Sequence, residues 1–279
     1  MGLMKPDTHM QQGHVERRYR EAVDGLPASW PDLIDALLSH RSVRSFAAAP
    51  LPVGAVELMV AAASSASTSS NKQFWSVLAV EDEARKKRLA TLCANQQWMA
   101  RAPVILVWLA DLSRMAQIGE SRGVKLEGLD YLESFLVAAM DATLAAQTAA
   151  IAAEAMGLGV VYIGAMRDHP VEVAAELGLP PRCFAVFGMC VGHPDPATAT
   201  GVKPRLPQPA VLHREQYATG AWSEPLRRYV AHNNAFRAEQ GMKPLDWDEQ
   251  IGERVKDAQA LKGREHLRDA LARLGFELK

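Results

Sequence analysis

The segment HRSVRSF, residues 40–46, places two arginines three positions apart with serine hydroxyls beside them. Arg41 and Arg44 carry planar guanidinium groups that can each pair with a phosphate through two hydrogen bonds, and Ser42 and Ser45 add hydroxyl donors. The segment also follows an apolar run, WPDLIDALL, and cations near a helix C-terminus complement its partial negative charge. Taken alone, the segment is compatible with a phosphate site and with a solvated helix end.

A second cationic segment, KPRLP, occupies residues 203–207 in a proline-rich stretch. Pro204 has a fixed φ, so Lys203 and Arg205 on either side of it have little freedom. This segment alone is equally compatible with an ordinary cationic loop. Together with HRSVRSF and the hydroxyl-rich segment SSASTSSNKQ, residues 64–73, it favours one anionic ligand that is bound by residues far apart in the sequence.

The sequence lacks the motifs of several other catalytic classes. It contains no GxSxG nucleophile elbow, no GxxxxGK[ST] phosphate loop and no HExxH motif. The glycines of GLGVVYIG, residues 157–164, follow a predicted helix and precede a predicted strand, which is the reverse of the order in dinucleotide-binding loops. The histidines and cysteines show no metal-ligand spacing, so we predict no metal site. An enzyme of this composition would depend on a bound organic cofactor for its chemistry.

The composition is that of a soluble globular protein, because 23% of the 279 residues are charged and 48% are hydrophobic. The formal net charge of −1 provides no basic field, so we predict no nucleic-acid partner. Residues 1–27 have no apolar stretch of the secretory type, and the cysteines are odd in number. We therefore predict a cytoplasmic protein in which Cys93, Cys183 and Cys190 are reduced core thiols.

One segment, FLVAAMDATLAAQTAAIAA at residues 135–153, approaches the length of a membrane span. Asp141 lies near its middle, and a charge at that depth costs a few kcal/mol on insertion scales. A helix that is apolar almost all round in a soluble protein is buried on several sides. We interpret this segment as a central helix, packed in part against its copy in a dimer, and predict no membrane association.

Apolar periodicity and turn residues divide the chain into helices and strands. We predict helices at residues 30–39 (with Ser29 as N-cap), 53–66, 83–93, 131–157 (with Gly157 at the C′ position), 170–177, 224–239 and 265–274. We predict strands at residues 75–81, 103–111, 159–165 and 183–192, and irregular structure at residues 193–213. This succession indicates an α/β or α+β sandwich, and its alternation is not strict enough to require a parallel sheet.

Several blocks, in one order, resemble the FMN-dependent nitroreductase family, and within it the oxygen-insensitive NADPH nitroreductases and the flavin reductases of luminous bacteria. The blocks are HRSVRSF, the hydroxyl-rich segment with its glutamine, CANQQWMARAPVILVWLAD, AAIAAEAMGLGVVYIGAMRD, and FAVFGMCVGHPD with KPRLP. The resemblance implies an α+β fold, namely a three-layer sandwich with a central, mostly antiparallel sheet. It also implies a domain-swapped homodimer with one FMN at each subunit boundary. We accordingly divide the chain into a polar arm (1–29), an FMN-binding domain (30–217) and a C-terminal helical extension of that domain (218–279).

The resemblance also implies roles for individual residues. The FMN phosphate and ribityl chain would be bound by His40, Arg41, Ser42, Arg44, Lys203 and Arg205, and by Ser67, Thr68 and Ser69 across the dimer. The ribityl chain or the ring edge would be bound by Gln96, and the backbone of Tyr162, Ile163 and Gly164 would lie by N5 and O4 of the flavin. Arg264 aligns with a substrate-binding arginine and could equally be a helix-surface cation. The arm of residues 1–29 has no counterpart in the family, Ala165 replaces a glycine, and residues 218–262 resemble the family least.

The mechanism implied by the resemblance is ping-pong. NADPH or NADH gives a hydride to flavin N5 and leaves, and a small-molecule acceptor (a nitroaromatic, a quinone or a flavin) then takes its place. Three alternatives stay open. One is a non-catalytic flavin-binding protein, and another is a narrow specialist of the same fold that fragments flavin or removes halogens. The third is a module that binds a phosphate-bearing ligand without flavin.

Overall fold

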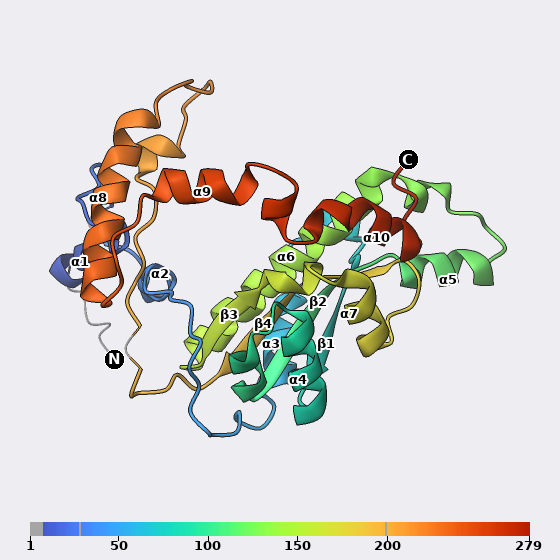
Figure 1. Cartoon of the computed structure of the whole chain (residues 1–279). Coiled ribbons are helices and arrows are strands. Elements are labelled where there is room, and N and C mark those ends of the chain that lie inside the picture. Colours follow the sequence, from blue (N-terminus) through green and yellow to red (C-terminus); the bar gives the residue numbers. More distant parts are fainter. Residues whose placement is uncertain (1–7, 28, 199) are drawn as a thin grey trace. The chain divides into compact units, whose positions relative to one another are not determined.

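The computed structural model describes residues 8–27, 29–198 and 200–279, and these residues form two units (Figure 1). The first unit consists of residues 42–198 and 257–279 and contains the β-sheet. The second consists of the described parts of residues 1–41 and 199–256 and contains helices and irregular chain. Each unit therefore combines two stretches that are far apart in the sequence.

The sheet of the first unit has four strands, β1 (Trp75–Val80), β2 (Val104–Asp111), β3 (Gly159–Ile163) and β4 (Cys183–Gly192). Their order is β1-β2-β4-β3, and every pairing is antiparallel. Antiparallel pairing without parallel crossovers confirms the predicted α+β class. The four strands lie where the apolar runs placed them, and β4 has the predicted bounds.

Helices cover both faces of this sheet. Because side chains alternate along a strand, Leu106 and Trp108 of β2 face one side, and Ile105 and Val107 face the other. The first side packs against α3 (Ala55–Ala63) and α6 (Leu132–Ala155), and the second against α4 (Glu83–Leu92) and α7 (Pro170–Leu177). All eight residues of β2 are buried as a result, which is why its sequence reads as a continuous apolar run.

The remaining helices differ more from the expectations. The first unit also contains α5 (Ser113–Ser121) and α10 (Leu267–Arg273), and the second contains α1 (Thr8–Tyr19), α2 (Asp32–Leu38), α8 (Ser223–Glu239) and α9 (Trp247–Val255). The sequence patterns did not predict α5 or α9, and α1 lies within the segment that was described only as a polar arm. The N-cap of α2 is Pro31 and not Ser29, so that prediction was wrong. Residues 1–7 of the predicted arm lie outside the described residues.

The long helix α6 is a core helix of the first unit. By length and composition alone it could cross a membrane, a property that buried helices of soluble proteins share. One of its faces packs against β2 and α3, and the carboxylate of Asp141 on that helix is only 2% exposed. After the helix, Gly157 has a φ of 76°, the left-handed conformation predicted for its C′ position.

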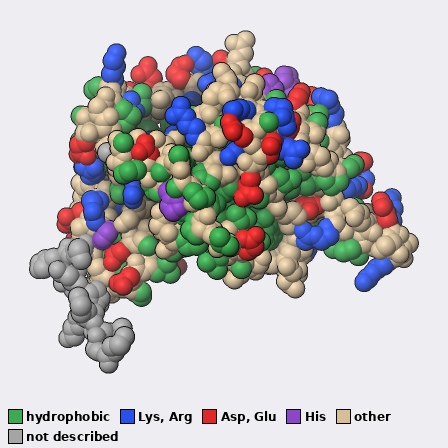
Figure 2. Space-filling model, turned by 90° about the horizontal axis from the view of Figure 1, so that it is seen from below, with side chains coloured by type: hydrophobic (Ala, Val, Ile, Leu, Met, Phe, Trp, Pro, Cys, Tyr) green, Lys and Arg blue, Asp and Glu red, His purple; other side chains and the backbone are tan. Residues whose placement is uncertain are grey.

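Charged side chains on the surface are of mixed sign. On the face that Figure 2 shows, Lys and Arg side chains are interspersed with Asp and Glu, and they do not form a single basic patch. This distribution is consistent with the net charge of −1 and gives no electrostatic footprint for nucleic acid on that face.

Candidate functional site

The boundary between the two units falls between Arg41 and Ser42, so each unit carries a part of the predicted site. The second unit holds His40, Arg41 and the KPRLP segment. Arg18 of α1 connects them, because its guanidinium donates hydrogen bonds to the carbonyls of His40 (2.6 Å) and Lys203 (2.9 Å). Two segments that are distant in the sequence thus meet at one side chain.

The basic side chains of this part are largely exposed. Lys203 and Arg205 are exposed on either side of the buried Pro204, so the alternation of the extended chain directs both toward solvent. Arg41 is also exposed, and its Nε donates to the Thr200 hydroxyl at 3.1 Å. Within the described part of the chain, neither Arg41 nor Arg205 forms an ion pair with a carboxylate. Guanidinium groups that are exposed and have no carboxylate partner can bind an anionic group of a ligand.

The rest of the HRSVRSF segment belongs to the first unit and is extended. Val43 N–H donates to the Val160 carbonyl at 2.9 Å, which places the segment beside β3. Val43 and Phe46 are buried, whereas Ser42 and Arg44 are exposed. Helix α2 ends at Leu38, so Ser42 and Arg44 do not lie at the end of a helix. The geometry therefore disfavours the interpretation of this segment as a solvated helix end.

The hydroxyl-rich loop is held by a single buried carboxylate. Asp141 accepts hydrogen bonds from the Thr68 hydroxyl (2.6 Å), the Ser69 N–H (3.2 Å) and the Phe74 N–H (3.1 Å). The Thr68 hydroxyl accepts in turn from the Gln73 N–H at 2.9 Å. Thr68 is thus engaged in holding the loop, while Ser67 and Ser69 are exposed. The sequence marked Asp141 as unusual in an apolar helix but did not indicate this contact.

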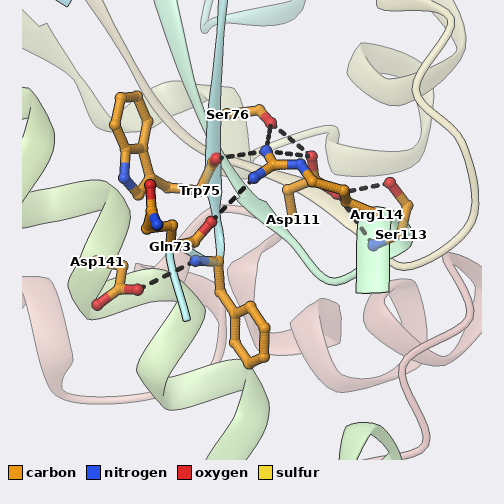
Figure 3. A network of polar contacts seen from close by, with 8 residues as sticks. Gln73, Trp75, Ser76, Asp111, Ser113, Arg114 and Asp141 are labelled. Carbon is orange, nitrogen blue, oxygen red and sulfur yellow. Dashed lines mark hydrogen bonds and ion pairs between the residues drawn. The ribbon is translucent and has the colours of Figure 1, made fainter. Parts of the chain in front are cut away.

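The same loop has an unusual backbone. Ser70, Asn71 and Gln73 have φ values of 50°, 54° and 51°, in the left-handed region that non-glycine residues rarely adopt. Such residues cost of order 1–3 kcal/mol each where they are strained, and they concentrate at functional sites. Arg114 helps to fix this conformation, because its guanidinium donates to the carbonyls of Gln73 (3.2 Å) and Trp75 (2.9 Å), as Figure 3 shows.

Asp111 and Arg114 form an ion pair with a separation of 3.6 Å at the end of β2. Burial opposes ionisation of Asp111, but hydrogen bonds from Ser113 and Ser76, together with the Arg114 charge, outweigh it and lower its pKa. The carboxylate is therefore charged at neutral pH and holds Arg114 beside the loop. This support was not predicted from the sequence, because its partners lie in two stretches, residues 73–76 and 111–114, that are far apart along the chain.

The predicted ring-binding residues occupy two positions of the first unit. Gln96 is half-buried, and its side chain donates to the Cys93 carbonyl at 3.0 Å. Ala94 and Asn95, which precede it, both have positive φ, at 56° and 54°. Non-glycine residues with a left-handed backbone therefore lie next to Gln96, as they also do in the hydroxyl-rich loop.

The end of β3 carries Tyr162, Ile163 and Gly164. The Tyr162 ring packs edge-on against Phe187 with the ring centres 5.1 Å apart, and burial raises the pKa of its hydroxyl. Gly164 opens a short 3₁₀ turn, Gly164–Arg167, at which the chain leaves the sheet. Ala165, at the position where the resemblance implies a glycine, is 6% exposed and packs in the core. Its methyl group is therefore directed into the protein interior.

This turn ends at Arg167 and is followed by Asp168, and the sequence did not single out either of these charged residues. Asp168 accepts a hydrogen bond from Arg264 Nε at 2.7 Å, and the Asp168 side chain is 9% exposed. Arg167 donates to the Val186 carbonyl, and its pKa is lowered by burial and by the nearby Arg264 charge. Gly263 has a φ of 93°, and a Cβ there would lie 3.0 Å from the Asp168 carbonyl oxygen. Arg264 lies on a short 3₁₀ helix, Arg264–His266, with its side chain 38% exposed, and its ion pair with Asp168 holds it near the end of β3.

The cysteines are unsuited to nucleophilic chemistry. Cys93, Cys183 and Cys190 are all free and buried, which confirms them as core thiols. Burial raises the pKa of each thiol to about 12. The thiolate fraction at neutral pH is therefore negligible.

A cavity of about 700 Å³ in the first unit contains none of the predicted site residues. It is lined by residues 47–57 together with Ala79, Glu81, Lys86 and residues 101–103. The buried Lys86 ammonium there donates to the carbonyls of Ala102 (2.6 Å) and Pro103 (3.2 Å). The Lys86 cation therefore already has two hydrogen-bond acceptors within the protein.

The fold is an antiparallel sheet covered by helices, and the exposed basic side chains described above are of the type that binds a phosphate group. The nitroreductase family matches residues 37–97 and 90–193, and the C-terminal domain of the same family matches residues 203–279. The chain belongs to the nitroreductase family, which confirms the resemblance seen in its sequence.

Individual relatives agree with this assignment. The FMN reductase (NADPH) of Bacillus subtilis strain 168 is 36% identical over 248 residues, which cover 87% of this chain and 97% of that protein. The oxygen-insensitive NADPH nitroreductase of Salmonella typhimurium is 36% identical over 184 residues, which cover 66% of this chain and 74% of that protein. The structure of B. megaterium NfrA2 superimposes with a TM-score of 0.83 at 33% identity, covering 90% of this chain and all of the other.

Proposed function

We propose that this chain is an FMN-dependent NAD(P)H oxidoreductase that passes a hydride, in ping-pong order, to nitroaromatic, quinone or flavin acceptors. Relatives that match most of the chain are named as an FMN reductase (NADPH) and an NADPH nitroreductase. The structural observation that carries the proposal is the presence of exposed guanidinium groups, on Arg41 and Arg205, that have no carboxylate partner among the described residues.

The available donors suit FMN, whose phosphate carries nearly two negative charges and accepts several hydrogen bonds. The residues proposed to hold the phosphate and ribityl chain are His40, Arg41, Ser42, Arg44, Ser67, Thr68, Ser69, Lys203 and Arg205. Those proposed to hold the ring are Gln96, Tyr162, Ile163 and Gly164. All of them lie within residues 30–217, the predicted FMN-binding domain. Bound FMN would supply the hydride chemistry, and the protein would supply binding and orientation.

The chain's own residues have distinct tasks in this proposal. Gly164 has no side chain, so a ring can approach the backbone at the end of β3. Asp141 fixes the loop that presents the Ser67 and Ser69 hydroxyls. Asp168 orients Arg264, and the guanidinium nitrogens of Arg264 other than Nε would bind an anionic group of the nucleotide or acceptor.

Arg264→Ala is expected to raise the KM of a carboxylate-bearing quinone about tenfold, because a hydrogen bond to a charged group contributes roughly 1.5 kcal/mol or more. The KM of an uncharged quinone and the affinity for FMN should not change. Arg268→Ala, which removes an exposed arginine on α10, is the matched control. Equal effects on both quinones would exclude a substrate-binding role for Arg264.

We also propose that two copies of the chain associate through α6. Leu132, Leu136, Met140 and Leu144 recur every four residues on one side of this helix and are 46%, 45%, 54% and 47% exposed. Such an apolar stripe is typical of an uncovered interface. Light scattering should give a mass twice the 30.4 kDa of one chain, and the substitution Leu136→Glu should reduce that mass to one chain. A monomeric wild-type protein would contradict the dimer.

Steady-state oxidation of NADPH, measured with and without a quinone, tests the proposed activity. The proposal predicts turnover that depends on FMN and on the acceptor. Bound FMN without turnover would instead indicate the non-catalytic flavin-binding protein, and turnover with one narrow acceptor class would indicate the specialist. The buried, free cysteines are consistent with the proposed cytoplasmic location.

A further inference from the structure

Arg18 is a buried cation in the N-terminal helix α1. Its residue is only 7% exposed, although arginine is almost always at the surface unless it is paired. One guanidinium nitrogen donates to the carbonyls of Leu38 (2.7 Å) and His40 (2.6 Å), and the other terminal nitrogen donates to the Lys203 carbonyl (2.9 Å). A single side chain therefore holds the backbone of both phosphate-binding segments.

The main chain of α1 strengthens this link. The Arg205 N–H donates to the Arg18 carbonyl at 3.0 Å, so Arg18 contacts KPRLP through its side chain and its backbone. The end of the helix is itself fixed within the second unit, because Arg20 pairs with Glu239 of α8 at 2.7 Å. Next to it, the Tyr19 carbonyl lies 3.1 Å from His232 Nδ1. The backbone that carries Arg18 is therefore held in place within the second unit.

The geometry of a guanidinium group suits this arrangement better than that of a lysine ammonium. Its rigid, planar fork directs separate N–H groups at acceptors on different segments, whereas a lysine ammonium is a compact point charge. The match to the nitroreductase family begins at residue 37, so α1 lies before the matched residues.

We infer that Arg18 is a positioning residue for the FMN phosphate. Its hydrogen bonds fix the distance between the backbone of His40 and the backbone of Lys203. This distance in turn determines where the side chains of Arg41, Lys203 and Arg205 lie. This inference rests on the proposed function, because it requires that these side chains bind FMN. Helix α1 is then a brace for the phosphate-binding segments and not a mobile arm.

The test compares FMN with riboflavin, which has the same ring but no phosphate. Apoprotein of the full chain is titrated with each flavin, and binding is followed by the change in flavin fluorescence. In Arg18→Met, we expect the Kd for FMN to rise about tenfold or more and the Kd for riboflavin to stay within about twofold. Arg18→Lys, which keeps the charge but loses the fork, should show an intermediate FMN Kd.

Arg17→Met is the matched control, because Arg17 is exposed and bonds within its own helix, to the Gly13 carbonyl at 3.2 Å. It should leave both dissociation constants unchanged. An unchanged FMN Kd in Arg18→Met, or an equal loss of FMN and riboflavin affinity, would overturn the inference. If Arg18→Met does not fold, the same comparison in Arg18→Lys decides the question. A wild-type apoprotein that binds neither flavin would instead overturn the proposed function, and the inference with it.

Discussion

Arg41→Ala is expected to raise the Kd for FMN about 10- to 100-fold. Arg41 is exposed, and its described hydrogen bond is to the Thr200 hydroxyl, so its removal should leave the fold intact. Hydrogen bonds to charged groups contribute about 1.5–3 kcal/mol, and each 1.4 kcal/mol changes a dissociation constant about tenfold. Titration of the apoprotein with FMN measures the change, and circular dichroism verifies that the variant is folded.

Thr200→Ala is the control for this experiment. It removes the same internal hydrogen bond but keeps the guanidinium charge, so its effect on FMN affinity should be small. A folded Arg41→Ala variant that binds FMN as tightly as the wild type would show that HRSVRSF does not bind the phosphate.

The second large effect is expected at Asp141. Asp141→Ala should lower the free energy of unfolding by about 2–4 kcal/mol, because it leaves the Thr68 hydroxyl and the Ser69 and Phe74 N–H groups without their acceptor. This is a large share of the roughly 5–15 kcal/mol that stabilises a typical domain. Urea unfolding followed by circular dichroism measures the change. The hydroxyl-rich loop with its left-handed residues should also become sensitive to protease in the native protein.

Glu133→Ala provides the comparison, because Glu133 is an exposed acid in the first turn of the same helix. Its loss should cost less than about 1 kcal/mol, the usual contribution of a charge near a helix terminus. If both variants were equally stable, Asp141 would not be the residue that holds the loop.

The sheet and the helices packed on it could be predicted from the sequence because burial leaves a direct pattern. The residues of β2 are apolar throughout since both faces are covered, and α6 is apolar almost all round since it packs on β2 and α3. The helices α5 and α9 left no such pattern. They carry few buried residues, and α9 has none, so the alternation of polar and apolar residues did not distinguish them from loops.

The types of residue in the candidate site could also be predicted, but the contacts that support them could not. Arg18 lies in a polar segment that resembles an exposed arm, and nothing in its neighbours indicates that it is buried against Lys203. Asp168 and Arg264 form an ion pair although they are 96 residues apart in the sequence. Such contacts depend on how distant segments fold together, and a single sequence shows the charges without showing the partners.

The most direct test of the proposed function is an anaerobic spectrum of the purified, FMN-loaded protein. We expect a yellow protein whose flavin absorbance bleaches when NADPH is added and returns when a quinone follows. A colourless protein that cannot be reconstituted with FMN, or a bound flavin that neither NADPH nor NADH bleaches, would contradict it.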